Sequence, residues 1–390
     1  MKEKRKKIAL GLLLSLLMLS GCWDSKEVEN LAVTTLIAWD RVDIEGQPKW
    51  QITTRIMNMA EQQSKGAEEK STAQEILIIG TGDTIQEAFN SLAKRVPASI
   101  FYEHSVGLVF GERVAREELT TVIDNTLRFP SSRVRDNVLV CKGMAAEILT
   151  AQPLLSSTLS KQIRKTADRT VEEAGVSYKV TVLDFTKQLV NKKRDTVLPL
   201  VKVYEKKQEE EIPEKTLEIA GFGVIREKEL VGWLEGEEAK IYVLILGKPQ
   251  YPHIPFNLQY DDNKLNYSIY KSKSKVAAKV IEGVPQYYLK VSVEGVIHET
   301  TKSDLSIEDR APLEKVIEEK ILEEVLQLVD KAREYDADIF GFNEYLYRYH
   351  PKEWQAIEPN WREHFQKAEI EVEVEAKIRS FGVTNKGIDI

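Results

Sequence analysis

The sequence predicts an α+β protein of several domains, with mixed or antiparallel sheets each packed by helices, behind a cleaved lipoprotein signal peptide. Through residues 31–204, β-branched segments alternate with segments of helical period, as in sheets that are covered by helices. From residue 216 strand patterns follow one another, and helices and a last strand end the chain. At 390 residues the chain is long enough for two or three domains.

The first 22 residues predict the cellular address. A basic head, Lys2 to Lys7, precedes an apolar run, Ile8 to Leu19, and then Ser20-Gly21-Cys22. The run is short for a membrane-spanning helix, and small residues before a cysteine are typical of a lipoprotein cleavage site. We expect residues 1–21 to be removed and Cys22 to carry S-diacylglycerol and an N-acyl chain such as palmitate; an uncut membrane anchor is the alternative. Trp23 and Asp24 are then membrane-proximal, since Trp favours the interface.

Charge and cysteine content exclude some classes of function. The chain has 55 basic and 62 acidic residues, and removal of residues 1–21 leaves 50 and 61, a formal charge of about −11. An acidic body of this kind does not favour nucleic acid as a partner. After lipidation of Cys22 only Cys141 remains as a thiol, so no internal disulfide is expected. Cys141 ends a short apolar strand pattern and is expected to be a buried core thiol.

Periodicity gives the elements of the N-terminal half. Thr84 and Glu87 form a capping-box pattern at the start of a helix, and the segment 60–74 has nothing to bury. We expect strands over 31–40, 50–57, 75–80, 104–110 and 137–141, helices over 84–96 and 114–127, and a loop over 60–74.

The domain boundaries follow from composition. Residues 151–194 are rich in helical pattern and charge and form a candidate helical subdomain, after which 195–204 return to a sheet. The charged run that follows contains Pro213; such a run either links domains or turns a hairpin, and we take 204–215 as the linker. The predicted domains are an N-terminal α+β region over 22–203 and a C-terminal α+β domain over 216–390.

The C-terminal domain contains the clearest helix of the chain. From Pro312 apolar residues recur at helical spacing as far as Ala332, with charges on the opposite side. Asp336 and Asp338 follow and are candidates for capping the next helix. We expect strands over 216–224, 229–234, 240–246, 265–271, 275–281, 287–297 and 368–378, and shorter helices over 335–349 and 351–366.

Motifs for catalysis or metal binding are not evident. The histidines are scattered and none has ligand spacing, so no metal and no cofactor are expected. No nucleophile elbow or phosphate-binding loop occurs, and Gly221 and Gly223 lie inside a strand pattern, where glycine marks a bulge or close packing. We therefore predict a non-enzymatic body that acts through protein contacts. An envelope hydrolase with two acidic catalytic residues remains an alternative, because the chain is rich in acids.

Several separated motifs resemble one family. The mature start Gly21-Cys22-Trp23-Asp24-Ser25-Lys26-Glu27 is similar to that of the Ger(x)C lipoproteins, the C-subunits of bacterial spore germinant receptors. The resemblance continues in Ala220 to Ile225, Leu230 to Leu234 and Glu237 to Ala239, and again in Asp336 to Phe342, Pro351 to Trp354 and Asn360-Trp361. It covers nearly the whole mature chain.

The resemblance implies a lipid-anchored receptor subunit on the outer face of the cytoplasmic membrane, which in a spore is the inner membrane. Its implied partners are the A-type and B-type membrane subunits of the receptor, and the bilayer through acylated Cys22. It implies no catalytic residues, and it makes direct binding of a small molecule the less favoured role for this subunit. The alternative function is a membrane-tethered solute-binding lipoprotein of a transporter, which would need two α/β lobes around a ligand cleft.

Overall fold

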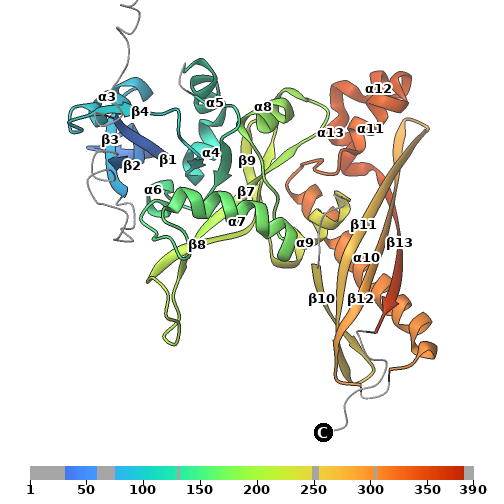
Figure 1. Cartoon of the computed structure of the whole chain (residues 1–390). Coiled ribbons are helices and arrows are strands. Elements are labelled where there is room, and N and C mark those ends of the chain that lie inside the picture. The colour runs from blue at the N-terminus through green and yellow to red at the C-terminus, as the bar shows by residue number, and fades with distance from the viewer. Residues whose placement is uncertain (1–30, 59–74, 130–131, 248–253, 303–304, 382–390) are drawn as a thin grey trace, which may run out of the picture.

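Two β-sheets organise the molecule (Figure 1). The computed structural model describes residues 31–58, 75–129, 132–247, 254–302 and 305–381. The first sheet has the strand order β3-β2-β1-β5-β6-β7-β8-β9, with β4 paired to the start of β1. Its strands are β1 (Leu31–Ile44), β2 (Gln47–Asn58), β3 (Glu75–Gly82), β4 (Ser99–Phe101), β5 (Gly107–Phe110), β6 (Asn137–Val140), β7 (Thr196–Glu205), β8 (Lys215–Arg226) and β9 (Glu229–Glu235).

The centre of this sheet is parallel and its edges are antiparallel. Strands β1, β5, β6 and β7 lie side by side and run parallel to one another. The outer groups β1–β2–β3 and β7–β8–β9 are antiparallel. The strands expected over 31–40 and 50–57 form the antiparallel β1–β2 hairpin, and its turn lies at Glu45-Gly46, which both have positive φ. The segment 60–74 lies outside the described residues.

Helices cover both faces of the first sheet. They are α3 (Ile85–Ala93), α4 (Glu112–Glu117), α5 (Leu119–Arg128), α6 (Ala145–Ile148), α7 (Leu159–Glu173) and α8 (Val182–Val190). The capping box of α3 forms as expected, with Thr84 accepting from the Glu87 amide. The predicted helix over 114–127 is divided at Glu118, where φ is −132°. Helices α7 and α8 contact the sheet, so 151–194 do not form a separate helical subdomain.

The segment 204–215 differs from the expected linker. Strands β7 and β8 pair antiparallel from Thr196↔Ile225 to Glu205↔Lys215, so the residues between them turn a hairpin within one sheet. A charged run with a proline is compatible with a domain linker or with a hairpin turn. The apolar faces of the flanking strands β7 and β8 favour the hairpin turn, because pairing in one sheet buries them. The division into an N-terminal and a C-terminal domain itself stays a prediction.

Residues 240–246 do not form the strand that was expected there. They belong to α9 (Gly236–Ile245), a helix that begins with Glu237 and Glu238 in its first turn. Its residues from Ile241 to Ile245 are all buried, because α9 contacts β8 and β9 on one side and β11 and α10 on the other. A helix buried all round shows no amphipathic period, and a short apolar run cannot be distinguished from a strand.

The second sheet has the order β10-β11-β12-β13. Its strands are β10 (Ile254–Tyr260), β11 (Asn263–Ile281), β12 (Val284–Thr300) and β13 (Glu369–Ser380), and only the β12–β13 pair is parallel. The strands expected over 265–271 and 275–281 are one continuous strand, and β10 was not expected. The polar run Ser272-Lys273-Ser274 resembles a turn in sequence, yet it continues the pairing with β12.

Helices cover one side of the second sheet. Helix α10 (Arg310–Glu334) buries the predicted apolar stripe from Leu313 to Ala332 against β10 and β13. It is followed by α11 (Phe342–Tyr349), α12 (Pro351–Ile357) and α13 (Trp361–Lys367). One hydrophobic cluster runs from the first sheet through α9 to the second sheet. The two sheets therefore share a continuous core.

Candidate functional site: the charged junction between the two sheets

The predicted lipidation site and its neighbours lie outside the described residues. Cys22, Trp23 and Asp24 precede the first described residue, Leu31, where β1 begins. Within the described part of the chain, no helix has the length and apolar character needed to cross a bilayer.

The first carboxylate of the junction is that of Asp195, directly before β7. Arg362 of α13 approaches it with both terminal nitrogens, at 3.0 and 3.1 Å, and forms a bidentate ion pair. Asp195 also accepts the backbone amide of Glu227 in the β8–β9 turn, at 2.9 Å, and that of Asp338, at 2.9 Å. The Asp195 side chain is only 2% exposed. One carboxylate thus joins three segments that lie far apart in the sequence.

Asp338 is the second carboxylate of the junction and is fully buried. It accepts the backbone amides of Gly341, Phe342 and Asn343, at 2.9 to 3.1 Å, and the side-chain amide of Asn343. These amides begin α11, so the predicted capping role of Asp338 is confirmed. Burial raises the pKa of Asp338 to about 6, although the amides of Asn343 and Phe342 lower it.

Asp336 does not cap this helix. It lies at the end of α10 with φ of 50°, and its backbone carbonyl accepts a hydrogen bond from Arg362. The left-handed conformation reverses the chain after α10 and returns it toward the first sheet. Asp336 therefore shapes the junction through its backbone.

Aromatic side chains complete the junction. The ring of Tyr335 lies over Gly232 of β9, where an added Cβ would be 2.1 Å from the ring, and its hydroxyl meets the backbone of Trp233. Tyr287 of β12 stacks on Phe342 with ring centroids 4.7 Å apart and donates to Asn343 at 2.8 Å. The first sheet, the second sheet and α11 are therefore fixed to one another by specific contacts.

The two buried carboxylates of the junction already have hydrogen-bond donors from the protein. Protein donors surround Asp195 and Asp338, so neither carboxylate is available as a base or a metal ligand. Among the described residues no group of three His, Cys, Asp or Glu side chains could hold a metal ion. Cys141 is buried, as predicted, and burial raises the pKa of its thiol. These features suit a structural joint better than a catalytic centre.

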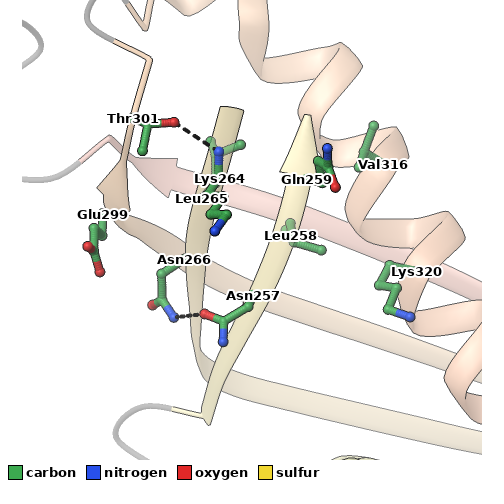
Figure 2. A pocket seen from close by; sticks show the side chains of 10 residues that line it. All are labelled: Asn257, Leu258, Gln259, Lys264, Leu265, Asn266, Glu299, Thr301, Val316 and Lys320. Atoms are coloured by element: carbon green, nitrogen blue, oxygen red, sulfur yellow. Dashed lines mark hydrogen bonds between the residues drawn. The ribbon is translucent and has the colours of Figure 1, made fainter. Parts of the chain in front are cut away.

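Two hollows are further candidates for a binding site. One, of about 340 Å³, lies beside the junction and is lined by Lys192, Lys228 and Trp361 among others. The larger, of about 750 Å³, lies between β10 and α10; Figure 2 shows Asn257 and Gln259 on one side and Val316 and Lys320 on the other. Its lining mixes polar and apolar side chains, and the Asn266 amide is already bonded to Asn257.

Two family models match most of the chain. Residues 24–203 match the model "Spore germination protein N-terminal domain", and residues 220–382 match "Spore germination B3/GerAC like, C-terminal". The chain belongs to the Ger(x)C family of spore germination proteins. The models describe spore germination proteins rather than a known class of enzymes.

Individual relatives of this Ger(x)C chain match it from end to end. Spore germination protein KC of Bacillus subtilis (strain 168) is 26% identical, over 98% of this chain and 97% of the relative. Spore germination protein B3 of the same organism is 23% identical, over 95% and 96%. The crystal structure of the GerBC protein superposes with a TM-score of 0.58 at 16% identity, covering 88% of this chain and 97% of that chain. It supports the α+β fold.

The motifs that carried the resemblance now have positions. The segments 220–225, 230–234 and 237–239 form β8, β9 and the start of α9, and 336–342 and 360–361 surround the junction. Sequence reasoning missed Asp195 and Arg362, because the partners are 167 residues apart. The nearest signal was the motif at Asn360-Trp361, directly before Arg362.

Proposed function

We propose that this protein is the lipid-anchored C-type subunit of a spore germinant receptor, held on the outer face of the spore's inner membrane by acylated Cys22. In this role it contacts the A-type and B-type membrane subunits and is required for the response to nutrients. The observation that carries the proposal is similarity over the whole chain to proteins named for spore germination. The Ser20-Gly21-Cys22 sequence supports the anchor.

The structure supports a role through surfaces rather than through chemistry. The buried carboxylates of the junction are occupied by protein donors, and the shared core joins the two sheets into one body. Such a body is suited to hold partner subunits in a fixed arrangement.

The alternative of a tethered solute-binding protein is not favoured by the fold. It requires two α/β lobes around a ligand cleft, whereas the second sheet is antiparallel except for its last strand. Calorimetric titration of the unlipidated protein with amino acids and sugars separates the two functions. Micromolar binding would favour the alternative.

Two strains test the proposed function and its anchor. Deletion of the gene should abolish germination with particular nutrients but preserve germination with non-nutrient agents, as followed by loss of optical density. In a Cys22→Ala strain the protein should be lost from spore membranes that are washed in high salt, which screens charge contacts, as measured by immunoblot, and the nutrient response should fall with it.

Cys141→Ala is the matched control, because it removes the other cysteine and leaves the lipidation site intact. It should stay in the membrane fraction and support germination. Normal nutrient germination in the deletion strain, with no paralogue covering for it, would contradict the receptor role. A Cys22→Ala protein that stays membrane-bound and fully active would contradict the anchor.

A further inference from the structure

Two leucines before α7 are unusually exposed. Leu154 is 41% exposed and Leu155 is 91% exposed, the highest value for a large apolar side chain in the described chain. They border a hollow of about 430 Å³ together with Lys165 and Arg169 of α7. Apolar and basic side chains thus face the same surface. We call Leu154, Leu155, Lys161, Arg164, Lys165 and Arg169 the α7 patch.

The charge of the α7 patch is opposite to that of the protein. Residues 159–169 include four basic side chains and one acid, Asp168, whereas the whole chain has a formal charge of −7. Asp168 is paired with Lys179 at 3.3 Å and so is already neutralised. Arg164 and Lys165 are exposed and have no ion pair with any other described residue. Their charge is available to an anionic surface.

The start of α7 is held close to the start of β1. Glu75 accepts the backbone amide of Leu159 at 3.1 Å, and its other oxygen accepts the Thr35 hydroxyl at 2.7 Å. In the sheet, Glu75 of β3 lies opposite Met57 of β2, and Met57 lies opposite Val33 of β1. Val33 is therefore two strand spacings from Glu75, at the same position along the strands. Two strand spacings are about 10 Å. The first turn of α7 is therefore near Leu31, where the described chain begins.

The length of chain before Leu31 limits its distance from the lipid. Eight residues separate Cys22 from Leu31. Fully extended, such a segment reaches about 30 Å. If Cys22 is lipidated, the α7 patch lies within reach of the same bilayer.

We infer that the α7 patch is a membrane-docking surface, which rests on the anionic lipid headgroups of the bilayer that holds Cys22. Leu155 enters the interface between headgroups and acyl chains, and Arg164 and Lys165 contact headgroup phosphates. Exposed leucine beside basic residues is typical of interfacial membrane contacts. The core of a protein interface, by contrast, is depleted of lysine. The inference deepens the proposed anchor and orients the body on the membrane.

The test uses the chain that begins after Cys22, without lipid. Every described helix and strand begins at Leu31 or later, so this chain retains all the described elements. It is mixed with vesicles of phosphatidylcholine, with or without phosphatidylglycerol, and bound protein is measured by flotation. We expect binding to the anionic vesicles that weakens as salt increases.

Substitutions identify the surface. Leu155→Ser and Lys165→Glu should each weaken binding to anionic vesicles, about tenfold and about fivefold respectively. The matched control is the pair Val190→Ser and Lys187→Glu on α8, since Val190 is 75% exposed and lies outside the patch. Control binding should equal that of the parent.

Each other outcome overturns the inference. The absence of binding to either vesicle would exclude a membrane surface, and equal binding to both would show that lipid charge is not recognised. Equal losses in patch and control variants would exclude the α7 patch. Because the tested chain carries no lipid, these outcomes are independent of whether Cys22 is acylated, which the membrane fractionation of Cys22→Ala tests separately.

Discussion

At the scale of single residues, the Asp195–Arg362 pair has a large expected effect on stability. Arg362→Gln leaves the buried Asp195 carboxylate without its cation, which typically costs about 3 kcal/mol. Arg379→Gln is the matched control, because Arg379 is 54% exposed and pairs with Glu294 at the surface. Such exposed pairs contribute less than about 1 kcal/mol.

Urea denaturation of the unlipidated chain measures both free energies of unfolding. Equal losses for the two arginine variants would show that the junction pair is not special. Residue-level prediction from sequence succeeded for local contacts, such as the Thr84 cap and the amides bound by Asp338. It failed for Asp195, whose partners come from distant segments that only the fold brings together.

At the scale of elements, close contact between β9 and the end of α10 makes Gly232 necessary. In Gly232→Ala the new Cβ would overlap the Tyr335 ring, so the ring or the strand must move, at a cost of about 1 to 3 kcal/mol. Tyr335→Leu in the same chain removes the overlap. The double variant should therefore lose less stability than the two single losses added together. Additive losses in thermal unfolding would contradict this contact.

Elements with one buried face were predictable, whereas a helix without an exposed face was not. Helix α10 and strand β12 have buried positions that recur with the period of a helix or a strand, and the sequence displays these periods directly. Helix α9 is enclosed on all sides and its sequence lacks that period. No residue of the run 204–215 is fully buried, so nothing in its composition distinguishes a hairpin turn from a linker.

At the scale of the whole molecule, the strand order of the first sheet indicates where the chain can be cut into a fragment that folds. A fragment of residues 31–203 lacks β8 and β9, so it exposes the edge of β7 and the core that α9 covers. A fragment of residues 31–247 keeps the first sheet and α9. We expect the shorter fragment to aggregate and the longer one to be more soluble.

Size-exclusion chromatography of the two fragments measures this difference. A monomeric, cooperatively folding 31–203 fragment would contradict it and support the boundary that composition predicted. The two family models divide the chain between residues 203 and 220, within the β7–β8 hairpin. If the shorter fragment aggregates, the matching segments do not coincide with folding units.

The parallel pairing of β12 with β13 sets an order of assembly. Between these strands the chain forms α10, α11, α12 and α13, so the second sheet gains its last strand only after all four helices have been made. Until then the face of α10 that covers β13 stays open to water. Contacts so distant in sequence form slowly, and exposed apolar surface favours aggregation meanwhile. This half of the protein therefore stays prone to aggregation until β13 has paired with β12.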